Sequence, residues 1–524
     1  MSAPSVLRHT AVVGAFTTLS RALGFVREIL MAVYFGTSLA KSAFDVAFRI
    51  PNLFRRLFGE GALSAAFVPV FSAALHREGP EAANRLAGRI MTMLALSLLL
   101  VTAGAIGAIS LVLRTWTLGE RAAAVLPLLR VMLPYMFFIC MVALCMGILN
   151  SHHHFAVPAV TPVVLNLVWI AVLVFACRRS AGTPLERVHA LAWGILLAGL
   201  LQLLMQIPAL LRFGFRPRFS LAWNDPGVRR VLTLMAPAAL GMGLTQVNVV
   251  IDGVLALAVG KWAPAALTYA ERLIYFPLGI FATALGTVLL PTFARQAARD
   301  RGEEVVATLN DALCNLLLVM MPAAVGLFVL ARPAVDLVFT WRGGLFDPLS
   351  AARTTRALLF YAPGLLLFSI YKMFVPAFYA MQDTRTPVRI GMRMVLLNFS
   401  LNVVFILTWP AEWKHAGLAL ATVIASGTNS LVLALILQRR IGTPDWTRIG
   451  GVALRVSLAA AVMGGAVRWL HAALAGFAAS WKLAPKAVEL LSVAGGILGG
   501  VLLYGALLLV VCRGELRRVV RWRG

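Results

Sequence analysis

The chain has 524 residues, of which 60% are hydrophobic and 13% charged, and its mean hydropathy is +0.86. This composition excludes a soluble multidomain protein and is typical of an all-α polytopic membrane protein. Apolar windows of membrane-spanning length recur along the whole chain, and we count about 14 of them.

The net charge of +26 suggests a nucleic-acid partner, because clustered Lys and Arg bind phosphate backbones. Membrane topology explains the charge better, so we expect no nucleic acid. With a cytoplasmic N-terminus and alternating spans, the cytoplasmic loops and tail hold the basic excess, and only the loop with Arg178, Arg179 and Arg187 opposes this. The strongest cytoplasmic clusters are Arg212, Arg216, Arg218, Arg229 and Arg230, and Arg513, Arg517, Arg518, Arg521 and Arg523.

The first predicted span, centred near Val26, carries Arg21, Arg27 and Glu28 among apolar residues. The N-terminus before it lacks a small-residue cleavage site, so we expect it to be retained. An ionisable group at bilayer depth costs about 2.5–3.5 kcal/mol, so such groups face a watery or ligand-filled interior. Arg21 and Glu28 are seven residues apart and share a helix face. The alternative is that the arginines snorkel to the membrane surface.

The second predicted span carries a polar stripe at helical spacing, with Arg55 set to one side. The stripe consists of Asp45, Arg49, Asn52, Arg56 and Glu60. Pro51 removes a backbone donor and Gly59 and Gly61 weaken the helix, which predicts a bent or interrupted segment beside a cavity. The alternative for Asp45 is a structural ion pair with Arg49.

Arginine outnumbers acid in this hairpin. Guanidinium groups bind phosphate bidentately and stay charged in any environment. We therefore expect a cavity suited to a phosphate-bearing anion, and less suited to a cationic drug.

The loop after the fourth span contains His152, His153 and His154 without nearby acids or cysteines, so a metal site is not expected. Five cysteines show no CxxC spacing and predict neither disulfides nor a metal knuckle. A phosphate-binding P-loop, a nucleophile elbow and an HExxH motif are all missing, so we do not expect an enzyme.

Further charges occur in the second half of the chain. Glu271 and Arg272 are adjacent in an apolar span, and either converge on the same cavity or form a local pair. Asp252 is a lone intramembrane carboxylate, and Asn398 and Asn402 share a helix face. Their oxygens suit a monovalent cation or a proton relay, or else hydrogen bonds between helices.

The two halves repeat one another. Pro134 and Pro158 match Pro363 and Pro387 at one common offset, and parallel repeats are a usual build of transporters. We expect two six-helix lobes at 1–222 and 223–445, followed by two extra helices and a basic tail at 446–524. The alternative is chance recurrence of Pro and Gly in an apolar chain.

Four segments make the sequence recognisable: SRALGFVREIL, AFRIPNLFRRLFGEGALSAAFVPVF, YAERLIYFPLGIFATALGTVLLPTF and VPAFYAMQDTRTPV. Together they resemble the MurJ (MviN) family of bacterial lipid II flippases, within the multidrug/oligosaccharidyl-lipid/polysaccharide exporter superfamily. The resemblance covers nearly the whole chain. It implies a multi-pass inner-membrane protein of 14 helices with a cationic cavity, and a groove for the undecaprenyl tail on helices 13 and 14.

By motif match, the resemblance assigns cavity arginines to Arg21, Arg27, Arg55 and Arg272, and nearby acids to Glu60 and Glu271. Some family members bind sodium, which would fall here on Asp252, Asn398 and Asn402. Two positions depart from the family pattern, since Ser42 and Tyr275 stand where many members carry an acid. We assign substrate binding to Arg21, Arg27, Glu28, Asp45, Arg49, Asn52, Arg55, Glu60, Glu271 and Arg272.

The resemblance implies that the chain moves lipid II from the cytoplasmic to the periplasmic leaflet by alternating access, as a monomer with both termini cytoplasmic. It implies no cofactor, with Na⁺, H⁺ or the membrane potential as the driving force, and lipid II, membrane lipids and cell-wall synthesis or division proteins as partners. The alternatives are a flippase for another polyprenyl-linked glycan, a multidrug antiporter, and a membrane scaffold with a basic tail.

Overall fold

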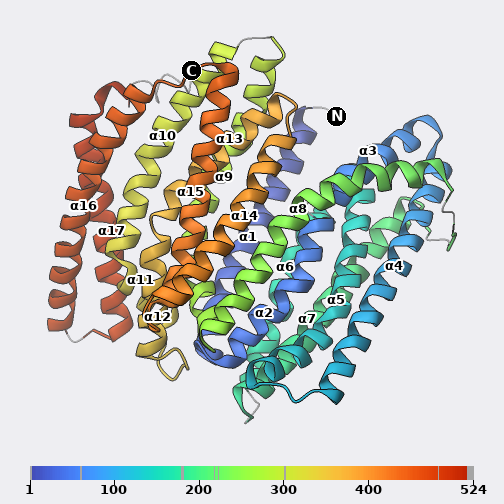
Figure 1. Ribbon diagram of the computed structural model, residues 1–524, viewed down its shortest axis with the longest axis horizontal. Helices are drawn as coiled ribbons and strands as arrows, with labels where there is room; N and C mark the ends of the chain where they lie inside the picture. Colours follow the sequence, from blue (N-terminus) through green and yellow to red (C-terminus); the bar gives the residue numbers. More distant parts are fainter. Residues whose placement is uncertain are drawn as a thin grey trace. The chain divides into compact units, whose positions relative to one another are not determined.

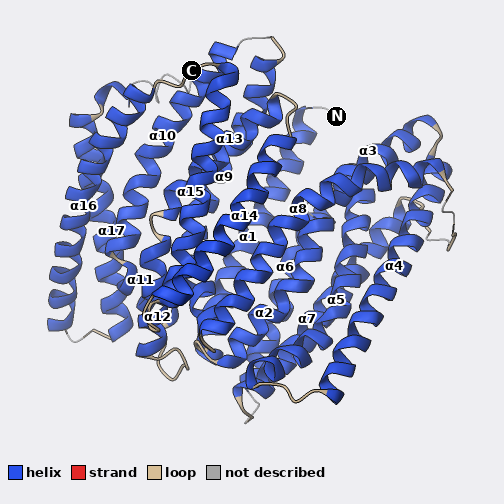
Figure 2. Cartoon of the chain, viewed as in Figure 1, coloured by secondary structure: helices blue, strands red, loops and turns tan. Residues whose placement is uncertain are grey.

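In the computed structural model, the described residues are 3–59, 62–178, 182–216, 219–221, 224–299, 302–481 and 483–515. Nearly all of them are helical and none of them forms a strand, as Figure 2 shows. Nine helices within these ranges are long and apolar enough to cross a membrane, or ten if the bent pair α12 and α13 forms one span. The expected all-α polytopic class is confirmed, and the count of about 14 spans stays a prediction.

The chain divides into two compact units, residues 1–265 with 343–345, and residues 266–342 with 346–524. The predicted lobe boundaries at 222 and 445 stay predictions. The helices of the first unit are α1 (Ala3–Phe35), α2 (Leu39–Phe54), α3 (Ala62–Arg77), α4 (Pro80–Thr115), α5 (Glu120–Ser151), α6 (Ala156–Ala171), α7 (Pro184–Arg212) and α8 (Pro226–Val259), with the π-helical segments η1 (Arg55–Gly59) and η2 (Val172–Cys177).

The second unit begins within α9 and ends after α17, and Figure 1 shows the order of its helices along the chain. These helices are α9 (Ala263–Ala297), α10 (Gly302–Val329), α11 (Ala331–Phe339), α12 (Pro348–Tyr361), α13 (Gly364–Ala380), α14 (Arg385–Thr408), α15 (Lys414–Ile441), α16 (Trp446–Ser480) and α17 (Pro485–Val511).

Helix α5 forms the centre of the first unit. Of its most apolar window, 72% is buried, and it packs against α2, α3, α4 and α7. In α4 only 11% of the corresponding window is buried, and Leu100 is 66% exposed. Because a spanning helix with an apolar exposed surface is solvated by hydrocarbon, α4 presents the lipid-facing side of this unit.

The second predicted span is interrupted, as its sequence indicates. Helix α2 contains Pro51, ends at Phe54 and continues directly as the π-helical segment η1. A π-helical turn widens the backbone by one residue and is frequent at functional sites. Glu60 and Gly61 lie outside the described residues.

Two turns, one in each unit, share a rare backbone geometry. Among the described residues, His153 (φ 58°) and Gln382 (φ 59°) are the non-glycine residues with positive φ. In each turn the next residue donates its backbone N–H to the carbonyl five residues earlier. His154 donates to Leu149 (2.9 Å), and Asp383 donates to Phe378 (3.0 Å). Both turns are Schellman helix ends. Their offset equals that of the proline pairs, which supports the predicted repeat.

The turn at Gln382 is fixed by a carboxylate. Asp383 accepts hydrogen bonds from the backbone N–H of Thr386 (2.9 Å) and from Nη1 of Arg440 (2.5 Å). Burial disfavours the charged form of Asp383, but the hydrogen bonds from Thr386 and Arg440 outweigh it and lower the pKa of Asp383 to about 2. The charged form of Asp383 therefore ties α14 to the end of α15.

Helices α16 and α17 lie side by side at one end of the second unit (Figure 1). Glycines allow this close packing, because a Cβ built at Gly500 would lie 2.5 Å from Cγ2 of Val467 and 3.5 Å from Cγ of Met463. Small residues bring helices together in membranes, where hydrophobic exclusion does not drive association.

We predict that Gly500→Leu lowers the melting temperature of the detergent-solubilised protein, by an amount equivalent to about 1–3 kcal/mol, because it overpacks the contact between α16 and α17. Gly505→Leu is the matched control, since nothing lies within 4 Å of a Cβ at Gly505. Equal melting temperatures for the two variants would contradict this account of the packing.

We predict that Asp383→Asn lowers the melting temperature at pH 7 and that most of the difference from wild type is lost as the pH falls from about 4 to about 2. The folded pKa lies below the unfolded value of about 3.9, so the stabilisation is present above the unfolded value and is lost as the pH falls through the folded one. Thermal unfolding followed across this pH range is the measurement. A difference at pH 2 as large as the one at pH 7 would refute the role of the carboxylate.

Candidate functional site: a charge network on α1 and α2

Arg27 on α1 is held on three sides. Nη2 donates to Oε1 of Glu28 at 2.7 Å, Nη1 donates to Oδ1 of Asn166 at 2.9 Å, and the guanidinium lies 4.2 Å from the centre of the Trp169 ring. The side chains of Arg27 and Glu28 are 13% and 6% exposed. An ion pair, an amide acceptor and a cation–π contact together compensate for lost hydration. The snorkelling alternative therefore does not describe Arg27.

Helix α6 holds the partners of Arg27 in place. The amide of Asn166 donates to the backbone carbonyl of Ser20 (2.9 Å) and to its hydroxyl (3.2 Å), which directs its oxygen to Arg27. The indole N–H of Trp169 points to Sδ of Met31 at 3.4 Å. The ring of Trp169 also packs edge-on against Phe44 and Phe48 of α2. The position of Arg27 thus depends on α1, α2 and α6 together.

Asp45 pairs with a residue that the sequence analysis did not name. Nζ of Lys41 donates to both carboxylate oxygens of Asp45, at 2.5 and 2.6 Å, and Lys41 is only 1% exposed. The alternative of an Asp45–Arg49 ion pair is therefore wrong in detail, since the i, i+4 partner lies on the N-terminal side. Lys41 could have been found from this spacing, because it belongs to the same helix face.

Arg49 and Arg56 lie against α8. Nη1 of Arg49 donates to the backbone carbonyl of Val249 at 2.5 Å, and its side chain crosses Gly253, where a Cβ would stand 2.7 Å from Nη1. Nη1 of Arg56 approaches Oε1 of Gln246 at 3.4 Å. Both hydrogen-bond acceptors are neutral. This part of the predicted polar stripe therefore contacts α8 and does not face an open cavity alone.

Arg55 begins the π-helical segment. Its Nε donates to Oδ1 of Asn52 at 2.8 Å, and both residues are partly buried. Because η1 is not a regular α-helix, the predicted position of Arg55 to one side of the stripe does not apply after Phe54. Glu60, which the sequence analysis placed in the same site, lies outside the described residues.

These charges form one network. The buried hydroxyl of Tyr135 on α5 lies within electrostatic range of Arg27 and Arg55. The carboxylate of Asp45 lies within range of Glu28 and Arg49 as well as its partner Lys41. An anion entering this region would meet several cations at once, inside a bundle where electrostatic interactions are weakly screened.

The remaining predicted substrate residues are more exposed. Arg21 on α1 and Arg272 on α9 have exposed side chains, and Glu271 is partly buried. Oε1 of Glu271 accepts a hydrogen bond from the hydroxyl of Tyr361 on α12, at 3.1 Å. Glu271 and Arg272 belong to the second unit, so the structure does not test their convergence with the network on α1 and α2.

The predicted cation ligands divide between the units. In the second, Nδ2 of Asn402 donates to Oδ1 of Asn398 (3.0 Å), and Nδ2 of Asn398 donates to Oγ1 of Thr422 on α15 (3.4 Å). In the first, Nδ2 of Asn248 donates to Oδ2 of Asp252 (3.3 Å). These contacts fit the alternative of hydrogen bonds within and between helices. Cation binding stays a prediction.

No group of three or more His, Cys, Asp or Glu within the described ranges could hold a metal ion. His152, in the histidine loop, stacks on Phe213 with ring centres 4.8 Å apart. Burial lowers the pKa of His152 below its usual range, and the nearby His153 acts in the same direction. His152 therefore packs the end of α5 against Phe213, which follows α7.

Sequence reasoning missed Lys41, Asn166, Trp169 and Tyr135. Spacing could have found Lys41, as noted above. The other three contact α1 or α2 only through tertiary packing, and an Asn, a Trp and a Tyr in apolar spans carry no local signal of an arginine partner.

Several known proteins resemble the chain. The family model described as "Lipid II flippase MurJ" matches residues 31–485. The "Lipid II flippase MurJ" of Burkholderia cenocepacia is 35% identical over 477 residues, 89% of this chain and 90% of the relative. The "Probable lipid II flippase MurJ" of Vibrio cholerae is 34% identical, over 97% of this chain and 96% of the relative.

Solved structures share the fold. A structure titled "Lipid II flippase MurJ, inward closed conformation" matches with a TM-score of 0.78 at 24% identity, covering 97% of this chain and all of that one. An inward-facing multidrug resistance MATE family transporter of the MOP superfamily matches with a TM-score of 0.68 at 16% identity, covering 80% and 94%. An outward-facing MATE family transporter matches with a TM-score of 0.57 at 14% identity, covering 83% of this chain and 95% of that one.

We predict that Lys41→Met destabilises the protein by roughly 3–5 kcal/mol, because it leaves the Asp45 carboxylate buried without its ammonium partner. The double variant Lys41→Met with Asp45→Leu should recover most of this loss. Unfolding in mixed micelles measures both.

The control is the exposed i, i+4 pair of Arg332 and Asp336, whose side chains are 45% and 25% exposed. Arg332→Gln should cost about 1 kcal/mol or less. If Lys41→Met costs no more than this control, the pair on α2 is not the buried pair described here.

Proposed function

We propose that this chain, which belongs to the MurJ family, is a lipid II flippase that moves the undecaprenyl-pyrophosphate-linked peptidoglycan precursor across the membrane for cell-wall synthesis. It is a transporter and not an enzyme. Transfer from the cytoplasmic to the periplasmic leaflet, an inner-membrane location and cytoplasmic termini are the finer parts of this proposal. The basic loop at Arg212, Arg216, Arg229 and Arg230 supports the orientation through the positive-inside rule.

The fixed guanidinium of Arg27 carries the proposal. A pyrophosphate has oxygens spaced for bidentate contact with planar guanidinium groups. Arg27 is already oriented by Glu28, Asn166 and Trp169, so little side-chain entropy is lost when an anion binds. Arg55 on the π-helical segment is the second residue to which we assign a phosphate contact.

We infer alternating access as the transport mechanism. The fold is shared with transporter structures described as inward-facing and outward-facing, which supports a cycle between two such states. In this cycle the arginines hold the headgroup while the lipid tail stays in the membrane along α16 and α17. Substrate binding by Arg21, Glu28, Asp45, Arg49, Asn52, Glu60, Glu271 and Arg272 belongs to the same proposal.

The driving force is part of the proposal. The arginines stay charged in every state, so a conformational change that moves net charge across the membrane responds to the potential by about 2.3 kcal/mol per charge per 100 mV. Sodium or proton coupling through Asp252, Asn398 and Asn402 is the alternative route, and no further cofactor is proposed. We propose a monomer, with cell-wall synthesis or division proteins as its partners.

A multidrug antiporter is the second candidate, since transporters of that type share the fold. A cationic drug favours a net-acidic site, whereas Arg49 and Arg56 donate here to neutral acceptors on α8. This observation favours an anionic substrate.

We predict that Arg27→Ala and Arg55→Ala each reduce lipid II translocation by at least tenfold, because each removes a charge-assisted contact to phosphate, worth about 1.5–3 kcal/mol. Translocation is measured in proteoliposomes by the appearance of lipid II in the opposite leaflet. Arg27→Lys should restore only part of the rate, since Lys lacks the bidentate fork.

Arg114→Ala is the matched control, an exposed arginine in the last turn of α4. Membrane insertion and melting temperature are checked for every variant. Normal translocation by well-folded Arg27→Ala and Arg55→Ala variants would refute the arginine mechanism.

A further inference from the structure

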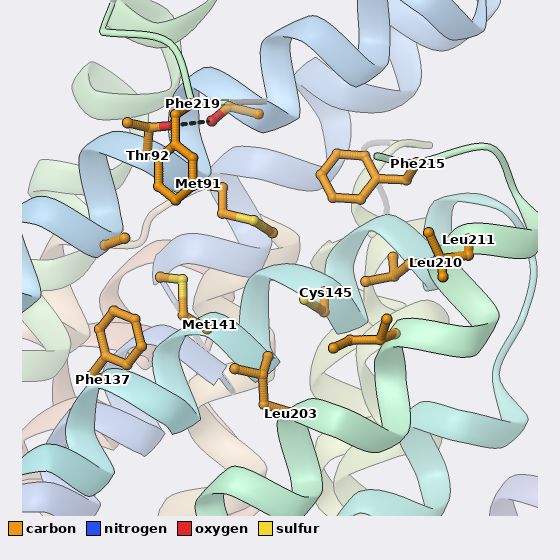
Figure 3. A pocket seen from close by; sticks show the side chains of 13 residues that line it. Met91, Thr92, Phe137, Met141, Cys145, Leu203, Leu210, Leu211, Phe215 and Phe219 are labelled. Carbon is orange, nitrogen blue, oxygen red and sulfur yellow. Dashed lines mark hydrogen bonds between the residues drawn. The ribbon is translucent and has the colours of Figure 1, made fainter. Parts of the chain in front are cut away.

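An apolar pocket of about 290 Å³ opens in the first unit between α4, α5 and α7 (Figure 3). Met91 of α4, Met141 of α5 and Leu203 of α7 line its wall. Phe215 and Phe219, from the segment that follows α7, lie at one end of it. None of these residues belongs to the charge network on α1 and α2.

The pocket offers nothing to a polar ligand. Thr92 contributes a hydroxyl, but this group already donates to the carbonyl of Gly88 (2.8 Å) and accepts from the N–H of Ser220 (3.3 Å). Among the residues that the structure describes, no charged side chain lines the pocket. Water needs two to four polar partners to occupy a cavity, and this one is large enough that leaving it empty is unfavourable. Hydrocarbon is the occupant that suits its lining.

The pocket is next to the lipid-facing surface of the unit. It is built on spanning helices, and one of its walls is α4, the lipid-facing helix of the unit. Ile207 and Leu211, on the side contributed by α7, are 40% and 52% exposed. A chain from the surrounding bilayer can therefore enter it sideways, without crossing polar surface.

Two exposed cations are next in the sequence to residues that line the pocket. Arg212 is the last residue of α7, beside the lining residue Leu211, and Arg216 follows the lining residue Phe215. The end of a spanning helix lies at the membrane surface, where lipid phosphates are. Guanidinium groups at this depth attract anionic headgroups.

We propose that this pocket binds one acyl chain of an anionic phospholipid, whose phosphate contacts Arg212 and Arg216. The proposal requires only that the chain spans a membrane and does not rest on the proposed function. Asp225, which precedes α8, caps that helix by accepting from Val228 N–H (3.0 Å), and it pairs with Arg89 of α4. A bound lipid fills a gap between α4, α5 and α7.

The test uses phosphatidylglycerol that carries a photoreactive diazirine in its acyl chain. The purified full-length protein is reconstituted in phosphatidylcholine vesicles containing this probe, irradiated and mapped by mass spectrometry. We expect adducts on residues of the pocket, such as Met141 and Leu203. Unlabelled phosphatidylglycerol should compete with the probe several-fold better than phosphatidylcholine.

Two pairs of variants test the chain and the headgroup separately. Leu203→Trp fills the pocket and should remove most pocket adducts, whereas Leu100→Trp, on the exposed face of α4, should leave them unchanged. Arg212→Gln and Arg216→Gln should each reduce the preference for phosphatidylglycerol by about fivefold, and Arg114→Gln should not.

If a variant fails to fold, the competition of phosphatidylglycerol and phosphatidylcholine with the probe on the wild-type protein still tests the proposal. Adducts scattered over the lipid-facing surface, or equal competition by phosphatidylcholine, would overturn it. Displacement of the probe by a polyprenyl phosphate but not by phosphatidylglycerol would also overturn it, because the pocket would then hold an isoprenoid tail.

Discussion

A cation inside a membrane-spanning bundle must replace its lost hydration with fixed partners, and the arrangement around Arg27 follows from this constraint. An adjacent acid, an amide oxygen and an indole face surround the guanidinium. Because Asn166 and Trp169 both come from α6, the charge on α1 requires α6 beside it. Since Trp169 also packs on Phe44 and Phe48, the same charge helps to determine where α2 lies.

The charges of α2 and of the π-helical segment η1 after it are compensated in two different ways. Near the start of α2, Lys41 and Asp45 neutralise one another within a single helix face. Further along, Arg49 and Arg56 rely on neutral groups of α8, and Gly253 gives the first of them room. The start of α2 is thus internally compensated, while the later part keeps positive charge. This gradient of charge suits an anion that binds near the interruption between α2 and α3.

The two turns at His153 and Gln382 have the same backbone geometry but different side-chain contacts. Both turns end a helix with a residue in the left-handed backbone region, which L residues other than glycine rarely adopt. The first is then packed by His152 and Phe213, and the second is tied by Asp383 and Arg440. The shared backbone geometry supports the predicted repeat, and different side chains stabilise the two turns.

Composition and helical periodicity by themselves determined the class of this protein, because hydrophobic length fixes membrane spans and charge at bilayer depth marks an interior site. They also indicated the interruption of the second span, since Pro51 acts on its own backbone. The i, i+4 spacing of Lys41 and Asp45 was open to the same local rules, but only the tertiary structure decided that Arg27 lies between Asn166 and Trp169 and that Arg49 lies over Gly253. Local sequence rules act over one or two helical turns, whereas these contacts join residues from 4 to about 200 positions apart, so packing of whole helices had to bring most of them together.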